Sequence, residues 1–211
     1  MKISIITPTF NSAATVRDTL SSIRMQDHPD IEHIIIDGGS KDLTKEILAE
    51  YNHISTVISE PDRGLYDAMN KGIRLATGDV IAILNSDDFY THPQVVSRAV
   101  AMLKQTGAAA LYADLEYVHA VRTSRVIRTW KAGPYRLDNF QWGWMPPHPT
   151  LYVRRSVFES LGAFDTSLRI AADYDWMLRL LLAGHRLAYI PQVQVRMRTG
   201  GASNRSVGNI M

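Results

Sequence analysis

The chain has 211 residues, of which 45% are hydrophobic and 21% are charged, as expected for one globular domain with a sizeable core. It contains no cysteine, which excludes a disulfide framework and thiolate chemistry. No apolar run approaches the roughly 20 residues of a membrane-spanning helix. The first residues have the pattern of a strand, so we expect no signal peptide and a cytoplasmic location.

The two halves of the chain differ in charge. Residues 1–105 contain 10 basic and 14 acidic side chains, a net charge of −4, and residues 106–211 contain 13 basic and 7 acidic, a net charge of +6. Twelve of those 13 cations are arginines, which suit phosphate and carboxylate groups. This predicts an anionic ligand or an acidic membrane surface, with a generally basic solvated face as the alternative. The arginines are scattered without a recognition motif, so we expect no nucleic-acid partner.

Strand and helix patterns alternate through the first half of the chain. The predicted strands are Lys2–Thr7, Glu32–Asp37, Thr56–Ser59 and Val80–Leu84, and the predicted helices are Ala13–Met25, a segment carrying Ile47, Leu48 and Tyr51, and Gly64–Ala76. This order favours an α/β fold with a parallel, doubly wound sheet, in which the loops that follow the strands gather at one edge.

The second half has a mixed pattern. We predict helices at Pro93–Lys104, Arg155–Leu161 and Asp173–Ala183, strands at Ala109–Tyr112, Thr150–Val153 and Ala188–Arg198, and a hairpin formed by Tyr117–Val121 and Arg125–Trp130. Residues 133–149 are rich in aromatic residues and proline, and they are too many for an ordinary connection. They are therefore expected to form a lid or a binding wall.

Two adjacent carboxylates, Asp87 and Asp88, follow the apolar strand that ends at Leu84. Like charges this close repel, and a cation beside them relieves the repulsion. Oxygen ligands at a strand end suit Mg²⁺ or Mn²⁺, which in turn suits a bound diphosphate. The alternative is a solvated turn in which Asp88 caps the next helix.

Polar residues also follow two other strands of the predicted sheet, at Thr7–Asn11 and at Asp37. Ligands of doubly wound sheets bind where such strand ends meet. The glycine-rich phosphate loops of kinase-like and dinucleotide-binding folds are absent. A nucleotide would therefore be held by hydrogen bonds to carboxylates and, at its phosphates, through a metal. The alternative role for Asp37 is a local turn leading into the next helix.

Asp67, Asn70 and Lys71 have i, i+3 and i+4 spacing, which puts them on one face of a helix. They either contact a ligand or form a local Asp67–Lys71 ion pair on the surface.

Asp173 and Asp175 open a later helix, where negative charge complements the helix dipole. The functional alternative is a general base that faces the pocket. His148 fits a satisfied loop histidine, a base or a substrate contact.

Together these stretches resemble family 2 inverting glycosyltransferases with the GT-A fold, and most closely the bacterial enzymes that build exopolysaccharide, capsule or O-antigen units. The resemblance covers essentially the whole chain. It rests on five stretches in the family's order and spacing: Thr7–Asn11, Asp37–Asp42, Glu60–Gly72, Asn85–Asp88 and Ala172–Asp175. It implies a Rossmann-like, mostly parallel central sheet flanked by helices, with a small hairpin or second sheet in the C-terminal half.

The resemblance also implies roles for individual residues. The nucleotide and donor sugar would be bound by Thr7, Pro8, Thr9, Asn11, Asp37, Asp62, Arg63, Asp67, Asn70, Lys71 and Asp87. Asp87 and Asp88 match the metal motif that bridges the diphosphate, and either could be the direct ligand. Asp173 falls where the family has its catalytic aspartate.

Three positions depart from the family pattern. Ala172 replaces a glutamate that usually precedes the catalytic aspartate, which leaves Asp175 as an alternative base. Asn85 replaces the first aspartate of the metal motif. Arg198 stands where many members carry a histidine, and an arginine there could clamp the diphosphate directly.

The aromatic loop, with Trp142, Trp144 and His148, is the expected acceptor wall, because flat rings suit sugar faces, and Asp175 is expected to contact the acceptor as well. The resemblance thus implies a single domain over residues 1–211, with residues 1–105 binding the nucleotide sugar and residues 106–211 the acceptor. The expected reaction moves a sugar from a nucleotide-diphosphate sugar, first of all a UDP-sugar, to a glycan or lipid-linked glycan. Mn²⁺ or Mg²⁺ is the expected cofactor, and peripheral contact with the inner membrane face is expected for a lipid-linked acceptor.

Three other functions fit parts of the sequence. A nucleotide-sugar-binding module without catalytic activity would explain Ala172. A sugar nucleotidyltransferase shares strand-end carboxylates, but it needs a glycine-rich loop with Arg or Lys after the first strand, which Thr7–Asn11 lacks. A haloacid-type phosphatase needs a D-x-D-x-T pattern, which is absent at Asp37.

Overall fold

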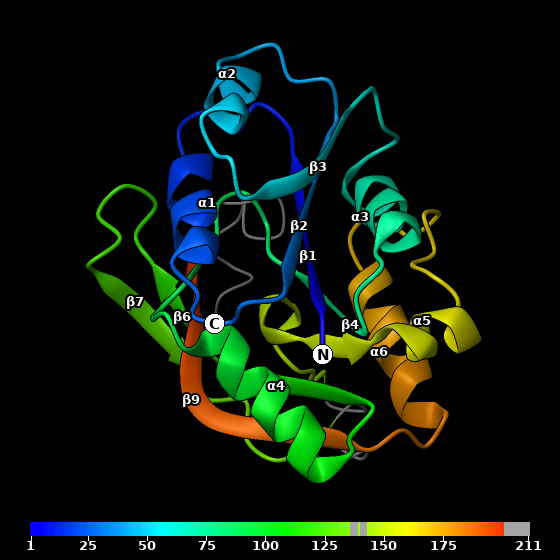
Figure 1. The fold of residues 1–211 in the computed structure, drawn as a ribbon. Coiled ribbons are helices and arrows are strands. Elements are labelled where there is room, and N and C mark those ends of the chain that lie inside the picture. Colours follow the sequence, from blue (N-terminus) through cyan, green and yellow to red (C-terminus); the bar gives the residue numbers. More distant parts are fainter. Residues whose placement is uncertain (136–138, 140–142, 201–211) are drawn as a thin grey trace.

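A computed structural model describes residues 1–135, 139 and 143–200 of the chain. Within them a nine-stranded sheet has the order β3-β2-β1-β4-β8-β6-β9-β5, and the ninth strand, β7, pairs with the later part of β6 (Figure 1). The strands are β1 (Ile3–Thr9), β2 (Ile31–Asp37), β3 (Ile54–Ser59), β4 (Val80–Ile83), β5 (Phe89–Tyr90), β6 (Ala110–Val118), β7 (Val126–Trp130), β8 (Tyr152–Arg154) and β9 (Leu187–Arg198).

Helices pack on both sides of this sheet (Figure 1). They are α1 (Val16–Arg24), α2 (Thr44–Ala49), α3 (Leu65–Leu75), α4 (Val95–Thr106), α5 (Arg155–Leu161), α6 (Ala172–Leu182) and the short 3₁₀ helix η2 (His148–Thr150). None of the helices in the part of the chain that the structure describes is long and apolar enough to cross a membrane.

The first half folds as its pattern predicts. Strands β3, β2, β1 and β4 are parallel neighbours, and the helices between them are the crossovers that parallel pairing requires. The register of β1 on β2 runs from Ile3 opposite Ile31 to Thr9 opposite Asp37. Two of the predicted ligand-binding residues therefore finish side by side at the same edge of the sheet.

Beyond β4 the sheet is mixed, because β8 pairs antiparallel with β4 and with β6. The predicted strands Ala109–Tyr112 and Tyr117–Val121 are one continuous strand, β6. Asp114 and Glu116 interrupt its apolar pattern, but both have partners from other strands. Tyr189 donates to Asp114 Oδ1 at 2.6 Å, and Arg196 pairs with Glu116 at 2.9 Å.

The predicted hairpin is present, but its strand β7 extends the central sheet instead of forming a second one. The two-residue strand β5 was not predicted. Thr150 lies in η2, so the predicted strand from Thr150 begins instead at Tyr152.

Alternating side chains of the central strands pack into hydrophobic clusters on the two faces of the sheet. Ile6, Ile81 and Ile83 pack with α3, α5 and α6 on one face, and their neighbours along the strands, Ile5 and Ala82, pack with α4 on the other. This two-sided burial explains why the strands are continuous apolar runs.

A buried histidine of β2, His33, lies next to the partly buried His53. His33 is fully buried, and its ring nitrogens lie 3.1 Å from Thr7 Oγ1 and 3.2 Å from Nε2 of His53. Burial, with a smaller contribution from His53, lowers the pKa of His33 to about 3. Because the unfolded chain binds a proton on His33 near pH 6.5, folding must exclude that proton below this pH.

We therefore expect the free energy of unfolding to be unaffected by His33 above about pH 6.5 and to fall as the pH drops toward 3. The loss has a limiting slope of about 1.4 kcal/mol per pH unit. His33→Gln should flatten this slope, measured by urea unfolding between pH 7 and pH 4, whereas His185→Gln, at the α6–β9 turn, should not. An unchanged slope in His33→Gln would show that other groups cause the acid sensitivity.

Candidate active site

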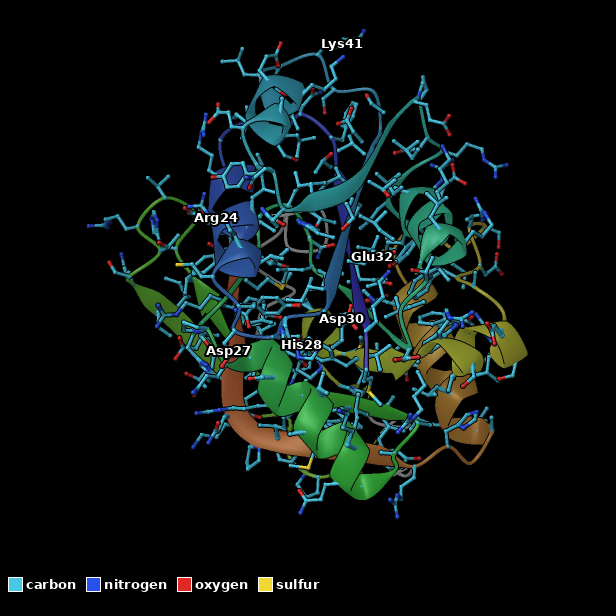
Figure 2. All side chains as sticks on the ribbon, in the orientation of Figure 1. Arg24, Asp27, His28, Asp30, Glu32 and Lys41 are labelled. Carbon is cyan, nitrogen blue, oxygen red and sulfur yellow. The ribbon has the colours of Figure 1, made fainter. Side chains whose placement is uncertain are left out.

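A cleft of about 660 Å³ opens at the carboxyl ends of β1, β2 and β4. In Figure 2 the label Lys41 marks the end of the molecule at which β2 finishes, and the label Asp30 marks the opposite end of that strand. The lining comes from these strand ends, the loops that follow them, the start of α3 and β9: Pro8, Thr9, Phe10, Asn11, Ser12, Ala14, Thr15, Gly38, Asp62, Gly64, Leu65, Ala68, Asn85, Ser86, Asp87 and Met197. It includes five of the predicted residues, Pro8, Thr9, Asn11, Asp62 and Asp87.

The loop after β1 is held in shape by hydrogen bonds across the cleft wall. Asn11 adopts a φ of 49°, a conformation that asparagine tolerates better than most residues. The main-chain N–H of Asn11 donates to Ser40 Oγ at 2.8 Å, and the main-chain N–H of Lys41 donates to Asn11 Oδ1 at 2.9 Å. Thr7, by contrast, is fully buried against His33 and does not line the cleft.

Asp37 lies under the floor of the cleft with no exposed surface. Its carboxylate accepts from the Ser40 N–H at 3.0 Å, Ser59 Oγ at 2.7 Å, Thr9 Oγ1 at 3.1 Å and also from Ser40 Oγ. Burial alone would raise the pKa of Asp37, but these hydrogen bonds outweigh it and hold the pKa below its usual range. Asp37 therefore has the local turn role in this structure.

Gly38 lines the cleft at a position without room for a side chain. A Cβ atom on this residue would lie 2.5 Å from Asp62 Oδ2 and 3.3 Å from Phe10 Cδ2, inside contact distance of both. Asp62 is itself fixed, because its Oδ1 accepts from the Gly64 N–H at 2.8 Å. Glycine therefore leaves this space beside Asp62 and Phe10 open.

Gly38→Ala should push the Asp62 carboxylate and the Phe10 ring into the cleft. We expect it to weaken binding of a nucleoside diphosphate by about tenfold, or 1.4 kcal/mol, as measured by calorimetry. Gly38→Ala with Asp62→Ser removes the clashing carboxylate and should regain part of the affinity. Unchanged affinity in Gly38→Ala would mean that the ligand does not enter this part of the cleft.

Asp87 and Asp88 have different surroundings. Asp87 lines the cleft, whereas Asp88 is fully buried, with Oδ1 lacking a hydrogen-bond partner and Oδ2 accepting from Asn85 Nδ2 at 3.2 Å. Burial raises the pKa of Asp87, and burial together with the charge of Asp87 raises the pKa of Asp88 well above its usual value. The pair therefore gains from any positive charge placed beside it.

These residues fit a divalent cation. The described residues contain no cluster of three or more histidine, cysteine, aspartate or glutamate side chains that could hold one alone. Mg²⁺ and similar ions commonly bind through one or two carboxylates together with substrate phosphates. The partnerless buried oxygen of Asp88, beside a cleft-facing Asp87, matches that second kind of site.

Arg198 supports the loop that carries Asp87. It is 6% exposed, its Nη1 donates to the main-chain oxygen of Asp87 at 2.7 Å, and its Nη2 pairs with Asp18. The guanidinium also lies over the Phe89 ring, 5.2 Å from its centroid. Since these contacts occupy the guanidinium, Arg198 positions the loop in this structure and does not line the cleft.

The polar side chains on the predicted face of α3 form hydrogen bonds and ion pairs with other groups of the protein. Asp67 accepts from the Arg63 N–H at 3.1 Å and lies 3.8 Å from Lys71 Nζ, which is closer to Glu60, at 2.8 Å. Asn70 exchanges two hydrogen bonds with the main chain of Phe164, at 2.8 and 2.9 Å. The structure therefore shows the local ion pair, with Asp67 buried instead of on the surface.

Asp173 lies at the start of α6. It is outside the cleft lining but next to α3, the helix whose first residue lines the cleft. Its Oδ1 accepts from Tyr66 Oη at 2.9 Å and from the Tyr174 N–H at 3.0 Å. Tyr66 follows Leu65, which lines the cleft, so this hydrogen bond connects the Asp173 carboxylate to the part of α3 at the cleft wall. Tyr66 was not among the predicted site residues, although its i, i+4 spacing puts it on the same face of α3 as the predicted Asn70.

The remaining predicted acceptor residues have structural partners. Asp175 pairs with Arg179 at 3.0 Å, and Trp144 Nε1 donates to the Ala132 oxygen at 2.9 Å. His148 is buried against the Phe164 ring, and burial lowers its pKa, partly opposed by the Asp173 charge. It is therefore a neutral residue near the carboxylate. Trp142 lies outside the described residues.

A mixed α/β sheet with helices on both faces is the fold of GT-A-like glycosyltransferases. The family model for glycosyl transferase family 2 matches residues 4–162, and the chain belongs to that family. A PGL/p-HBAD biosynthesis glycosyltransferase of Mycobacterium bovis is 32% identical over 180 residues, 83% of this chain and 68% of the relative. Glycosyltransferase AglE of Haloferax volcanii is 26% identical over 198 residues, 90% of this chain and 65% of AglE.

Solved structures confirm the fold. TarS 1-349 of S. aureus in complex with UDP-GlcNAc has a TM-score of 0.80 at 21% identity, covering 94% of this chain and 59% of that one. The mannosyltransferase PcManGT of Pyrobaculum calidifontis, with GDP-Man and Mn²⁺, has a TM-score of 0.71 at 20% identity, covering 92% and 56%. The chain spans only 38% of a longer TarS chain.

Proposed function

We propose that this chain is an inverting glycosyltransferase that moves a sugar from a nucleotide-diphosphate sugar to a hydroxyl group of a glycan or lipid-linked glycan. The observation that carries the proposal is the cleft-facing Asp87, backed by the buried Asp88, at the meeting point of β1, β2 and β4. Family membership supports the same reaction class.

In the proposed complex the nucleotide lies between the loop after β1 and Gly38. Asp62 and the amide groups of the loop offer hydrogen bonds to the base and ribose. Asp37 holds this wall in place through Ser40 and Thr9, and thus acts on the nucleotide indirectly.

The diphosphate lies beside Asp87. A divalent cation, Mn²⁺ or Mg²⁺, held by Asp87 and the oxygen atoms of the diphosphate would neutralise the charge that develops on the leaving group. Asp88 places a second carboxyl group behind Asp87, and a cation beside the pair would favour its ionised form. Arg198 fixes the loop through the Asp87 main chain.

Asp173 is the proposed general base. Its carboxylate takes the proton of the acceptor hydroxyl while the hydroxyl oxygen attacks the anomeric carbon. The bond from that carbon to the diphosphate breaks on the opposite face, so the configuration inverts. Tyr66 and the Tyr174 N–H hold one carboxylate oxygen, which leaves Oδ2 for the acceptor.

Ala172 bears on the alternative of a module without catalytic activity. The residue is fully buried in the core that α6 shares with α3 and α5. A glutamate at this position would be a charge inside that core, so alanine fits the packing here. The exchange leaves Asp173 itself at the helix start and does not remove the proposed base.

A UDP-sugar is the first donor to test, since TarS 1-349 was solved with UDP-GlcNAc. We expect UDP-sugars with Mn²⁺ to raise the melting temperature of the chain in a thermal-shift screen and to release UDP when an acceptor is added. GDP-mannose is the matched alternative. Stabilisation without turnover by any donor would favour the binding module, and no stabilisation by any nucleotide sugar would contradict the proposal.

A further inference from the structure

One exposed part of the molecule takes no part in the proposed chemistry. Residues 119–131, here called the basic hairpin, form the turn before β7 and β7 itself, and Figure 1 shows them projecting from the body of the protein. Every residue from Ala120 to Thr129 except Thr123 is exposed. Such a projecting element adds little to the core, so its composition is free to serve another purpose.

The basic hairpin combines positive charge with exposed aliphatic side chains. It carries four cations at three-residue intervals, Arg122, Arg125, Arg128 and Lys131, and no acidic residue. Among the residues that the structure describes, Arg122, Arg125 and Lys131 form no ion pair. Val121, directly before Arg122, is 84% exposed, and Val126 and Ile127, between Arg125 and Arg128, are 40% and 45% exposed.

An alternative role for cations on an edge strand is to prevent the strand from pairing with other chains. That role explains the arginines, but it gives no reason for a valine at the tip with 84% of its surface in water. Cations that attract anionic headgroups, with aliphatic groups between them that enter the headgroup boundary, are the features of an interfacial membrane contact.

The base of the basic hairpin is tied to the proposed diphosphate site. Arg198 Nε donates to the main-chain oxygen of Ala120 at 3.1 Å, and Nη1 of the same guanidinium donates to the main-chain oxygen of Asp87 at 2.7 Å. A surface bound by the hairpin would thus be held at a fixed position relative to the cleft. A lipid-linked acceptor arriving from that surface would meet the cleft in one orientation.

We propose that the basic hairpin docks the protein on a bilayer of anionic phospholipids. The docking itself stands on the exposed residues of the hairpin, and only its purpose, delivery of a lipid-linked acceptor, rests on the proposed function. Removing the docking should therefore leave sugar transfer to a water-soluble acceptor unchanged.

The test is co-sedimentation of the full chain with vesicles of phosphatidylcholine alone or mixed with phosphatidylglycerol. We expect binding to the mixed vesicles only, lowered at least tenfold by Arg122→Glu with Arg125→Glu, because each cation near the surface contributes to the attraction. The matched control, Arg74→Glu with Arg186→Glu, makes the same change in net charge at two exposed cations outside the hairpin and should bind like the unmodified chain.

Val121→Ser with Ile127→Ser tests the aliphatic part and should weaken the binding that remains at high salt, where charge attraction is screened. Equal loss in the control pair, or equal binding to neutral vesicles, would overturn the proposal. So would tighter binding of single-stranded RNA than of mixed vesicles, or a salt-dependent dimer in place of vesicle binding. Retained transfer to a water-soluble acceptor in the hairpin variants would separate failure of docking from failure of the proposed function.

Discussion

Asp173→Asn is expected to lower the turnover number by about 10²–10⁴-fold, the usual contribution of a general base. The amide cannot take the proton of the acceptor hydroxyl, whereas its size and its contacts with Tyr66 and the Tyr174 N–H can persist. The dissociation constant of the donor should stay within a few-fold of the original, because Asp173 lies outside the cleft lining. Steady-state UDP release and calorimetry measure the two quantities.

Asp175→Asn is the matched control, on the same helix two residues away. It removes a partly exposed ion pair with Arg179, which is worth about 0.3–0.5 kcal/mol, and should leave turnover nearly unchanged. Tyr66→Phe keeps the base but frees its oxygen, so its loss should be smaller than that of Asp173→Asn. If Asp175→Asn carries the large loss and Asp173→Asn does not, the base is assigned to the wrong carboxylate.

Asp87→Asn is expected to weaken Mn²⁺-dependent binding of the donor by roughly 100-fold, since loss of an outer-shell partner already costs 10–100-fold. The physical reason is that Asp87 is the carboxylate of the pair that lines the cleft. Calorimetry with and without Mn²⁺ should show the metal's contribution almost abolished in this variant.

Asp88→Asn separates the two carboxylates. Asp88 is fully buried and next to a like charge, so the amide should leave the melting temperature of the metal-free protein unchanged or higher. Its effect on donor binding should be smaller than that of Asp87→Asn. A larger effect for Asp88→Asn would assign the direct contact to Asp88.

The parallel half of the fold could be predicted because each strand is an apolar run followed by an amphipathic helix. The mixed half could not, because β4 and β8 are far apart in sequence and nothing local determines that they pair. Asp114 shows the same limit. A buried aspartate looks like the end of a strand until Tyr189 and the Ala132 N–H are seen to satisfy it.

Part of the candidate site could likewise be predicted from the sequence, and part could not. Strand-end position predicted that Thr9 and Asp87 lie at one edge of the sheet, and both line the same cleft in the structure. Gly38, which also lines it, was not among the predicted residues. The roles of Asp37 and Asn70 could not be read from sequence, because groups that suit a ligand equally suit the protein's own loops. Both are occupied by neighbouring chain segments in the structure.

The proposed function requires that the cleft binds a nucleoside diphosphate with a cation between Asp87 and the phosphates. Crystals grown with UDP and Mn²⁺, measured at a wavelength where manganese scatters anomalously, test it directly. We predict a manganese peak beside Asp87 and a uracil ring near Gly38 and Asp62. A peak remote from Asp87, or a nucleotide outside the cleft, would contradict the account.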